Sequence, residues 1–278
     1  MKPQKRFHFI CGLSPQTEPF HLVHYLCLAS CLAVNQPDEL NVHVRNEPYG
    51  PLWDRIKGRV TLRHIDDEST KGFTSSYYAN HAEGRMITKH GNHYAHEADF
   101  IRLAVLGREG GVYVDIDTLF VEPYPDRLYA EPCVMCEEGA PLNSNGVLNP
   151  TLCNAVIFAQ PQNAFIEQWE REAKLVFDGT WSKHSCQLAT KLWHQLPGQL
   201  IVAPHQWFYH FGYDRNGIRS LFEESVTVPE QLMSIHLWAS LWWSKERTEL
   251  TRFHAGLVDE TYVARGTSTY AEIKKQFL

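Results

Sequence analysis

Over the first part of the chain, short apolar runs alternate with polar turns in the order strand, helix, strand, strand. Strands are predicted at residues 7–13, 40–44 and 60–65, because each is a short apolar or alternating run that ends at turn-forming residues. Residues 19–35 carry apolar side chains at three- and four-residue steps, the spacing of a helix that buries one face. This order predicts an α/β fold with a mostly parallel sheet, in which ligands bind beyond the carboxyl ends of the strands.

The same pattern continues in the middle of the chain and then becomes less regular. A helix is predicted at residues 95–108, ended by Gly110 and Gly111, followed by strands at 112–116 and 155–159 and a helix at 163–177. From about residue 183 the sequence is irregular and rich in aromatic residues. Because no internal repeat or linker divides the chain, we expect a single domain over residues 1–278.

Composition and charge narrow the classes of function. A hydrophobic fraction of 44% with 21% charged residues is ordinary for a folded chain and too apolar for a disordered one. The formal net charge is −6, from 26 basic and 32 acidic residues, whereas a protein that binds nucleic acid needs a basic face. We therefore expect no nucleic-acid partner.

The seven cysteines are odd in number and lie mostly in apolar stretches, which is typical of a reduced, cytoplasmic chain. Cys133 and Cys136 form a CxxC pair, but no second pair follows at zinc spacing, so we interpret them as core thiols. The longest apolar run, residues 22–34, is shorter than the roughly 20 residues of a membrane span, and we expect no signal peptide or transmembrane segment. Peripheral association with a membrane is left open.

The most informative segment is residues 96–125, which contains Asp115-Ile116-Asp117 after an apolar run. If residues 112–117 form one strand, Asp115 and Asp117 share a face, with Cα atoms roughly 6.6 Å apart. Two carboxylates that point the same way repel each other unless a cation or a proton offsets them. The pair can therefore converge on one hard divalent cation, directly or through water. An isolated DxD motif is more often a strand end with solvated acids than a metal site. The residues around the motif therefore decide between these two interpretations.

Those surroundings place further polar residues on otherwise apolar elements. Asp99 and Arg102 lie three residues apart, which puts them on one face of the preceding helix. The double glycine that follows allows a tight turn from that helix into the strand. The segment predicts one compact polar site that comprises Asp99, Arg102, Asp115 and Asp117.

These residues carry a family resemblance. Residues 98–117, with ADFIR, the double glycine and GVYVDID, resemble the sugar-binding region of DXD glycosyltransferases, specifically glycosyltransferase family 32 and more distantly the glucosylating bacterial toxins. Looser matches are the N-terminal strand-helix-strand and residues 154–159 (NAVIFA), and residues 236–238 (HLW) resemble the closing loop of the family. The resemblance implies a GT-A-like (Rossmann-like) fold, with a mixed, mostly parallel sheet flanked by helices and an irregular, aromatic-rich C-terminal part.

The resemblance also implies roles for the residues of the site. Mn²⁺ or Mg²⁺ is implied as the cofactor, with Asp117 linking it to the donor diphosphate and Asp115 contacting the ribose or a metal-bound water. Asp99 is implied to accept hydrogen bonds from donor sugar hydroxyls, and Arg102 to face sugar or phosphate, so that Asp99, Arg102 and Asp117 are the predicted catalytic residues. The first strand is implied to meet the base through backbone groups, and the donor-binding set then adds Phe9, Ile10, Cys11, Gly12 and Ile116.

Three further residues each have two interpretations. Asn154, at the start of a predicted strand, either contacts the donor or acceptor or is a turn asparagine. His236 either completes the metal shell, since imidazole is an acceptable ligand for Mn²⁺, or is a satisfied core histidine. Trp238 either stacks on the donor or packs in the core, and Trp242 and Trp243 have the same two interpretations.

Together, these observations predict a metal-dependent, retaining glycosyltransferase that moves a hexose from a nucleotide-sugar, with a UDP-sugar as the expected donor. The acceptor is left open among a glycan, a lipid-linked saccharide, a metabolite and a protein. We expect residues 1–125 to bind the nucleotide-sugar and residues 126–278 to form the acceptor-binding and closing part.

Two alternatives remain. Residues 115–119 (DIDTL) also fit the nucleophile loop of haloacid-dehalogenase-type phosphatases, with Asp115 as the nucleophile, although that motif normally lies on the first strand. The other alternative is a non-catalytic protein that binds a nucleotide-sugar without turning it over.

Overall fold

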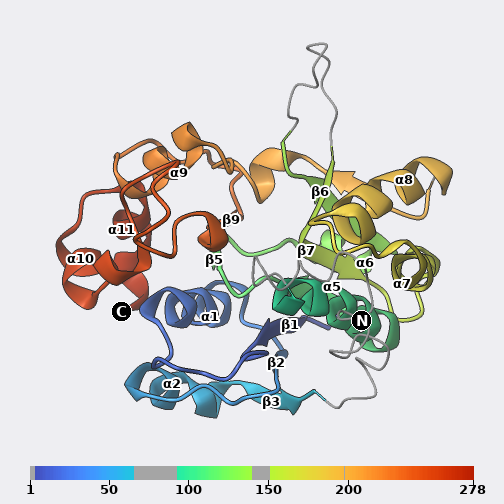
Figure 1. The fold of residues 1–278 in the computed structure, drawn as a ribbon, viewed down its shortest axis with the longest axis horizontal. Helices are drawn as coiled ribbons and strands as arrows, with labels where there is room; N and C mark the ends of the chain where they lie inside the picture. Colours follow the sequence, from blue (N-terminus) through green and yellow to red (C-terminus); the bar gives the residue numbers. More distant parts are fainter. Residues whose placement is uncertain (1–3, 66–92, 140–150, 197) are drawn as a thin grey trace.

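A single large sheet forms the centre of the molecule (Figure 1). The computed structural model describes residues 4–65, 93–139, 151–196 and 198–278. Within these ranges, a seven-stranded sheet has the order β3-β2-β1-β4-β7-β6-β8, and β5 pairs with β9 in a separate two-stranded sheet. The strands are β1 (Arg6–Cys11), β2 (Glu39–Val44), β3 (Thr61–His64), β4 (Gly111–Val114), β5 (Thr118–Phe120), β6 (Cys133–Glu137), β7 (Leu152–Ala159), β8 (Ile201–Ala203) and β9 (Ser234–His236).

Most neighbouring strands of the large sheet run parallel. β1 pairs in parallel with β2 and β4, β2 with β3, and β6 with β8, whereas β7 runs antiparallel to β4 and β6. The predicted α/β class, with a mixed, mostly parallel sheet flanked by helices, is confirmed. Because β6, β7 and β8 follow residue 125, both predicted parts of the chain contribute to this sheet, and the division of labour between them stays a prediction.

Helices cover both faces of the sheet. They are α1 (Leu22–Asn35), α2 (Pro51–Ile56), α5 (His93–Glu109), α6 (Asp126–Ala130), α7 (Ala164–Val176), α8 (Leu188–Gln195), α9 (Arg215–Phe222), α10 (Glu260–Arg265) and α11 (Thr269–Lys274). Shorter helical segments are η1 (Lys57–Arg59), η2 (Lys183–Gln187), η3 (His205–Trp207), η4 (Ala239–Leu241), η5 (Ala255–Leu257) and η6 (Lys275–Phe277). Figure 1 shows α5, α7 and α8 together on one side of the molecule and α1 on the other, next to the C-terminal helices.

The side chains of β1 alternate between two hydrophobic cores. Phe7 and Phe9 pack with α1 in one core, and Ile10 packs with residues of α5, α7 and α8 in the other. β4 continues the alternation, with Val112 and Val114 in the first core and Tyr113 in the second. Because both faces are covered, β4 is a rigid central strand, and the residues that follow it start from a fixed position.

The predicted N-terminal elements are confirmed, with bounds that shift at polar residues. α1 begins at Leu22 rather than at residue 19, because His21 is its N-cap and its ring nitrogen accepts a hydrogen bond from the N–H of Val23 (3.2 Å). β1 ends at Cys11, two residues earlier than predicted, because Gly12 turns the chain with a φ of 63°.

The double glycine between α5 and β4 is required by crowding. Gly110 and Gly111 both have positive φ, of 65° and 97°. A Cβ on Gly110 would lie 2.6 Å from the backbone nitrogen of Pro161, and one on Gly111 would lie 2.7 Å from the carbonyl oxygen of Arg6. The sequence correctly predicted the turn, which places β4 between β1 and β7.

The C-terminal part is irregular and aromatic-rich, as predicted. Trp242 is fully buried and packs on Phe222 with ring centroids 4.4 Å apart, and Phe222 stacks on Phe253 at 4.5 Å. Trp242 is therefore a core residue, which decides between its two interpretations.

The CxxC cysteines also belong to the core. Cys133 and Cys136 lie in β6 and face different cores, so their sulfur atoms point away from each other. All seven cysteines lie in the described ranges and each is a free thiol. None of the helices described is both long and apolar enough to cross a bilayer.

Candidate active site

Asp115 and Asp117 lie at the carboxyl end of β4, in the turn that leads into β5. β4 ends at Val114, its last residue paired with β7, and the N–H of Thr118 closes the turn by donating to the carbonyl of Asp115 (3.0 Å). The prediction of one strand over residues 112–117 is therefore wrong. The two carboxylates converge because the chain turns here, and not because side chains alternate along a strand.

His236 completes a group of three side chains that could hold a metal ion. β9 pairs with β5 so that His236 lies opposite Thr118, which brings its ring to the turn. One ligand atom from each of Asp115, Asp117 and His236 lies within 4.8 Å of the other two. His236 Nε2 is 3.2 Å from Asp117 Oδ1 and 3.8 Å from Asp115 Oδ2. The structure thus brings together all three residues predicted as metal ligands.

The surroundings push the pKa values of these three groups apart. Burial raises the pKa of Asp115, and the Arg102 and His236 charges offset this only in part. Burial acts on Asp117 as well, but His236 and the backbone N–H of Ala239 outweigh it and lower the pKa of Asp117 to about 2. Burial would lower the pKa of His236, but the two aspartates raise it. The negative charge of Asp115 is therefore only partly compensated, and a divalent cation would offset the remaining charge.

Arg102 lies between the carboxylates of Asp99 and Asp115, both of which were predicted to belong to the site. Its guanidinium is 3.1 Å from Asp99 and 3.3 Å from Asp115, and it donates to the carbonyl of Asn154 (2.7 Å). It also stacks 4.4 Å from the ring centre of Tyr113, whose hydroxyl donates to Asp115 (2.6 Å). Because its side chain is only 5% exposed, Arg102 compensates two acids away from water and fixes their orientation.

Asp99 is held by residues from two other elements. The amide of Asn154 in β7 donates to Asp99 Oδ1 (2.7 Å), and Nε2 of His184 in η2 donates to Oδ2 (2.9 Å). Burial would raise the pKa of Asp99, but Arg102 and His184 lower it below its ordinary value. Asp99 is thus an ionised, oriented acceptor. Asn154 belongs to the site and is not a turn asparagine.

These residues line a cavity of about 540 Å³ at the carboxyl end of the sheet, hereafter the donor-end cavity. This is the position at which open α/β sheets bind ligands. The lining residues are Ile10, Ala95, Ala98, Asp99, Arg102, Tyr113, Asp115, Ile116, Asp117, Glu138, Cys153, Asn154, Ala155, Trp181, Ser182, Ser185, Cys186, Tyr213, His236, Trp238, Ser240 and Leu241.

The first strand contributes less to this cavity than predicted. Of Phe9, Ile10, Cys11 and Gly12, Ile10 alone is among the lining residues. The side chain of Phe9 is fully buried in the core, and the carbonyl of Gly12 accepts hydrogen bonds from the backbone and the side chain of Asn46. Contact between the backbone of this strand and a base stays a prediction. Ile116, in the turn, does line the cavity.

Trp238 lines the cavity and has an unusual backbone conformation. Its φ is 54°, a left-handed value that costs a non-glycine residue about 1–2 kcal/mol. The indole N–H donates to the carbonyl of Phe211 (2.8 Å), and the N–H of Ala239 donates to Asp117 (2.8 Å). Strain that is held in this way is typical of functional sites. Trp243, by contrast, stacks on His24 at 4.8 Å and is not among the lining residues.

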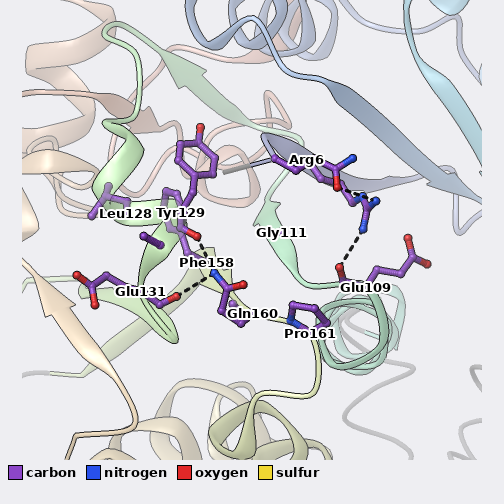
Figure 2. Close-up of a pocket in the computed structure, with 12 residues that line it drawn as sticks. Arg6, Glu109, Gly111, Leu128, Tyr129, Glu131, Phe158, Gln160 and Pro161 are labelled. Carbon is purple, nitrogen blue, oxygen red and sulfur yellow. Dashed lines mark hydrogen bonds between the residues drawn. The ribbon is translucent and has the colours of Figure 1, made fainter. Parts of the chain in front are cut away.

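A second cavity lies at the opposite end of β1 and β4 (Figure 2). It has about 440 Å³ and is lined by the starts of β1 and β4 and the end of β7. Arg6 donates to the carbonyl of Glu109 (3.0 Å) and pairs with Glu39 (2.8 Å), and the amide of Gln160 donates to the carbonyl of Tyr129 (2.6 Å). These donors thus already form hydrogen bonds within the protein.

Sequence reasoning missed the residues that η2 brings to the site. His184 reaches Asp99 across 85 positions of the chain, and Cys186 reaches Asn154 across 32. η2 is kinked at Ser185, whose φ of −103° and ψ of −107° are not helical, and its residues show no periodicity that would predict this arrangement. Tyr113 could have been found, because it precedes Asp115 by two positions and the predicted strand placed both side chains on one face.

Known proteins resemble this chain in the same region. Residues 59–135 match the family described as "Glycosyltransferase sugar-binding region containing DXD motif". The chain is 31% identical over 210 residues to "Glucan organizing enzyme 1" of Cryptococcus neoformans var. grubii, which covers 73% of this chain and 52% of that protein. It is 37% identical over 75 residues to "Subversion of eukaryotic traffic protein A" of Legionella pneumophila, covering 27% of this chain and 11% of that protein.

Among solved structures, "PaToxG Glycosyltransferase" is similar with a TM-score of 0.48 and 18% identity, covering 70% of each chain. The chain spans about half the length of the first curated relative, at 52%. The resemblance inferred from the sequence is confirmed over these residues, and the sheet is mixed and mostly parallel, as the resemblance implied. Residues 59–135 therefore match the DXD-bearing sugar-binding region of glycosyltransferases, and the DXD lies at Asp115 and Asp117.

Proposed function

We propose that this chain is a metal-dependent, retaining glycosyltransferase that moves a hexose from a UDP-sugar to an acceptor hydroxyl. The observation that carries the proposal is the convergence of Asp115, Asp117 and His236 at the wall of a cavity that also contains Asp99 and Arg102. The match of residues 59–135 to the DXD sugar-binding region supports the same function.

The ligand atoms fit a divalent cation. Two carboxylates and one imidazole are a set that Mn²⁺ accepts, and the raised pKa of Asp115 shows that negative charge at this point lacks full compensation. Asp115, Asp117 and His236 would hold the ion. When bound, such a cation supplies Lewis-acid stabilisation of the charge that develops on a departing diphosphate.

The remaining residues position the donor. Asp99, whose orientation Asn154 and His184 fix, presents acceptor oxygens to sugar hydroxyls. Arg102 contributes a fixed positive charge beside them, which favours the developing charge of the leaving group. Both groups act by orientation and electrostatics, because Asp99 stays ionised and Arg102 stays protonated.

The transfer balances as follows. The acceptor hydroxyl oxygen forms a new bond to C1 of the sugar, and the bond from C1 to the diphosphate oxygen breaks with both electrons on UDP. The hydroxyl proton passes to the departing diphosphate. Retention of the anomeric configuration is proposed on the resemblance to the DXD family and predicts that an α-linked donor gives an α-linked product.

Donor hydrolysis and transfer test the proposal. The full chain is incubated with UDP-glucose, UDP-galactose, UDP-N-acetylglucosamine and GDP-mannose, each with Mn²⁺, Mg²⁺ or EDTA, and released UDP or GDP and the product anomer are measured. We expect turnover of a UDP-sugar that EDTA abolishes. In Asp117→Asn, turnover should fall by about three orders of magnitude, equivalent to about 4 kcal/mol of transition-state stabilisation.

The matched control is Asp54→Asn, which alters an exposed acid in α2 that pairs with the neighbouring Lys57, and it should leave turnover unchanged. Metal-dependent binding of a UDP-sugar without any turnover would favour the non-catalytic alternative. Capture of a phosphoryl group on Asp115 would favour the phosphatase.

A further inference from the structure

A third cavity, of about 500 Å³, adjoins the donor-end cavity; we call it the side cavity. Glu138, at the end of β6, lines both cavities. The hydroxyl of Thr151 donates to one oxygen of Glu138 (2.7 Å) and fixes the carboxylate at this junction. Glu138 lines the donor-end cavity together with Asp117 and His236, so the junction opens onto the cavity of the proposed metal ligands.

The chain after η3 forms the wall between the two cavities. Tyr209 and Phe211 line the side cavity, whereas Tyr213 lines the donor-end cavity. The indole of Trp238, in the donor-end cavity, donates to the carbonyl of Phe211 (2.8 Å). The rings of Tyr213 and Trp238 are 5.4 Å apart. One aromatic wall thus faces both cavities, so occupants of the two would lie next to each other.

The chemistry of the side cavity fits a neutral, hydroxyl-rich ligand. His210, Asn216 and Thr227 are exposed and bring an imidazole, an amide and a hydroxyl to its surface, above the buried ring of Phe211. These groups both donate and accept hydrogen bonds, as sugar hydroxyls do. Among the described residues that line it, none is Lys or Arg, while Glu138 and Asp214 are acidic. Phosphorylated acceptors would meet repulsion here.

We infer that the side cavity is the acceptor subsite and that it takes a neutral saccharide, whose reacting hydroxyl passes the Glu138 carboxylate to enter the donor-end cavity. This inference rests on the proposed glycosyltransferase function. Glu138 accepts a hydrogen bond from a saccharide hydroxyl, and Asn216 and His210 contact the saccharide further from the reacting carbon.

Oligosaccharide binding and transfer kinetics test this inference in the full chain. The probes are laminaritriose, maltotriose, cellotriose and chitotriose, and binding in the presence of UDP is measured by saturation-transfer NMR. We expect at least one probe to bind and to act as an acceptor. In Glu138→Gln and Asn216→Ala, the KM for that oligosaccharide should rise about tenfold more than the KM for the donor, because a hydrogen bond to the acceptor is lost.

Matched substitutions at exposed positions serve as controls. Glu122→Gln replaces an exposed glutamate outside both cavities, and His194→Ala serves the same purpose for His210→Ala. Neither control should change oligosaccharide binding.

The outcomes separate the inference from the proposed function. If no probe binds, or if Glu138→Gln, Asn216→Ala and His210→Ala all bind as the parent does, the acceptor subsite is not here, even where donor hydrolysis persists. If the oligosaccharide binds and these variants weaken it, but no nucleotide-sugar is turned over, the side cavity binds saccharide and the proposed function fails instead.

Discussion

The two ends of the central sheet each have a cavity of similar size, about 540 Å³ at the carboxyl ends of β1 and β4 and about 440 Å³ at their amino ends. Each cavity contains an arginine close to an acid. At the amino end, Arg6 donates to the backbone carbonyl of Glu109 (Figure 2). It also forms a partly exposed pair with Glu39. At the carboxyl end, Arg102 is almost fully buried between Asp99 and Asp115.

The difference lies in the charge that remains uncompensated. In the amino-end cavity, the guanidinium of Arg6 and the side-chain amide of Gln160 already have acceptors within the protein. In the donor-end cavity, three ligand atoms lie within 4.8 Å and Asp115 has a raised pKa despite Arg102 and His236. Residual charge of this kind makes the binding of a cation and a charged ligand favourable. Cavity volume alone contributes no such binding free energy.

Buried histidines show the same contrast. His8 and His43 lie in contact with each other between β1 and β2 (3.0 Å), and burial lowers their pKa values to about 3 and about 4. At the other end of the sheet, the aspartates raise the pKa of His236. The same residue type is therefore neutral where burial outweighs the charge of one acid, Glu109, and favours its charged form beside Asp115 and Asp117.

The largest expected effect is on stability at Arg102. Arg102→Gln leaves Asp99 and Asp115 buried without their cation, so the free energy of unfolding should fall by about 3–5 kcal/mol. Arg6→Gln breaks a partly exposed pair and should cost about 1 kcal/mol or less. Urea unfolding of both variants measures the difference. Equal losses would mean that the two ends of the sheet do not differ in the way described.

Acid should unfold the chain through His8 and His43, where burial outweighs the opposing charge of Glu109. The folded pKa values of His8 and His43 lie below the unfolded value of about 6.5, so the unfolded chain takes up protons first as the pH falls. Between pH 6.5 and about 4, each histidine should lower the free energy of unfolding by about 1.4 kcal/mol per pH unit. His43→Gln should remove one such contribution from the urea-unfolding profile against pH. An unchanged acid slope would argue against it.

His184 should affect binding of the donor sugar more than binding of the nucleotide. His184→Phe keeps a ring beside Phe100 but removes the hydrogen bond to Asp99. We expect the Kd for the UDP-sugar to rise about tenfold, equivalent to about 1.4 kcal/mol, with little change in the Kd for UDP. Calorimetric titration with both ligands gives the ratio, and exposed His194→Phe is the control. If both Kd values rise equally, His184 is only a structural residue.

The smallest expected effect is at the amino-end cavity. Gln160 is exposed, and its side-chain amide donates to the backbone carbonyls of Tyr129 and Glu131. Gln160→Ala should leave donor turnover within about twofold of the parent, since surface changes away from a site cost little. A loss comparable with that of Asp117→Asn would place part of the function at this end of the sheet.

Local patterns were sufficient to predict the elements and part of the site. The strand and helix runs of the first 65 residues and the double glycine are visible because each depends on neighbours in sequence. Asp99 and Arg102 share a helix face for the same reason. The turn at Asp115–Asp117 was wrongly predicted as strand, because residues with alternating polarity look the same whether the ladder continues or ends.

Contacts between residues that lie far apart in the sequence could not be predicted from local patterns. His184 lies 85 positions from Asp99, in a kinked segment that no sequence periodicity predicts. Glu138 gains its position from the ends of β6 and β7, which pair there (Glu137 with Leu152). His236 was found only through its resemblance to the closing loop, since its partner strand β5 begins 118 residues before it, at Thr118.

Manganese binding tests the central claim most directly. Mn²⁺ is titrated into the full chain with UDP present, and the free ion is followed by its electron paramagnetic resonance signal. We predict that the parent and Asp54→Asn each bind a single Mn²⁺ per chain and that Asp115→Asn and Asp117→Asn weaken this binding by about 10–100-fold or more. Undiminished Mn²⁺ binding in both aspartate variants, with the fold intact by circular dichroism, would contradict the account.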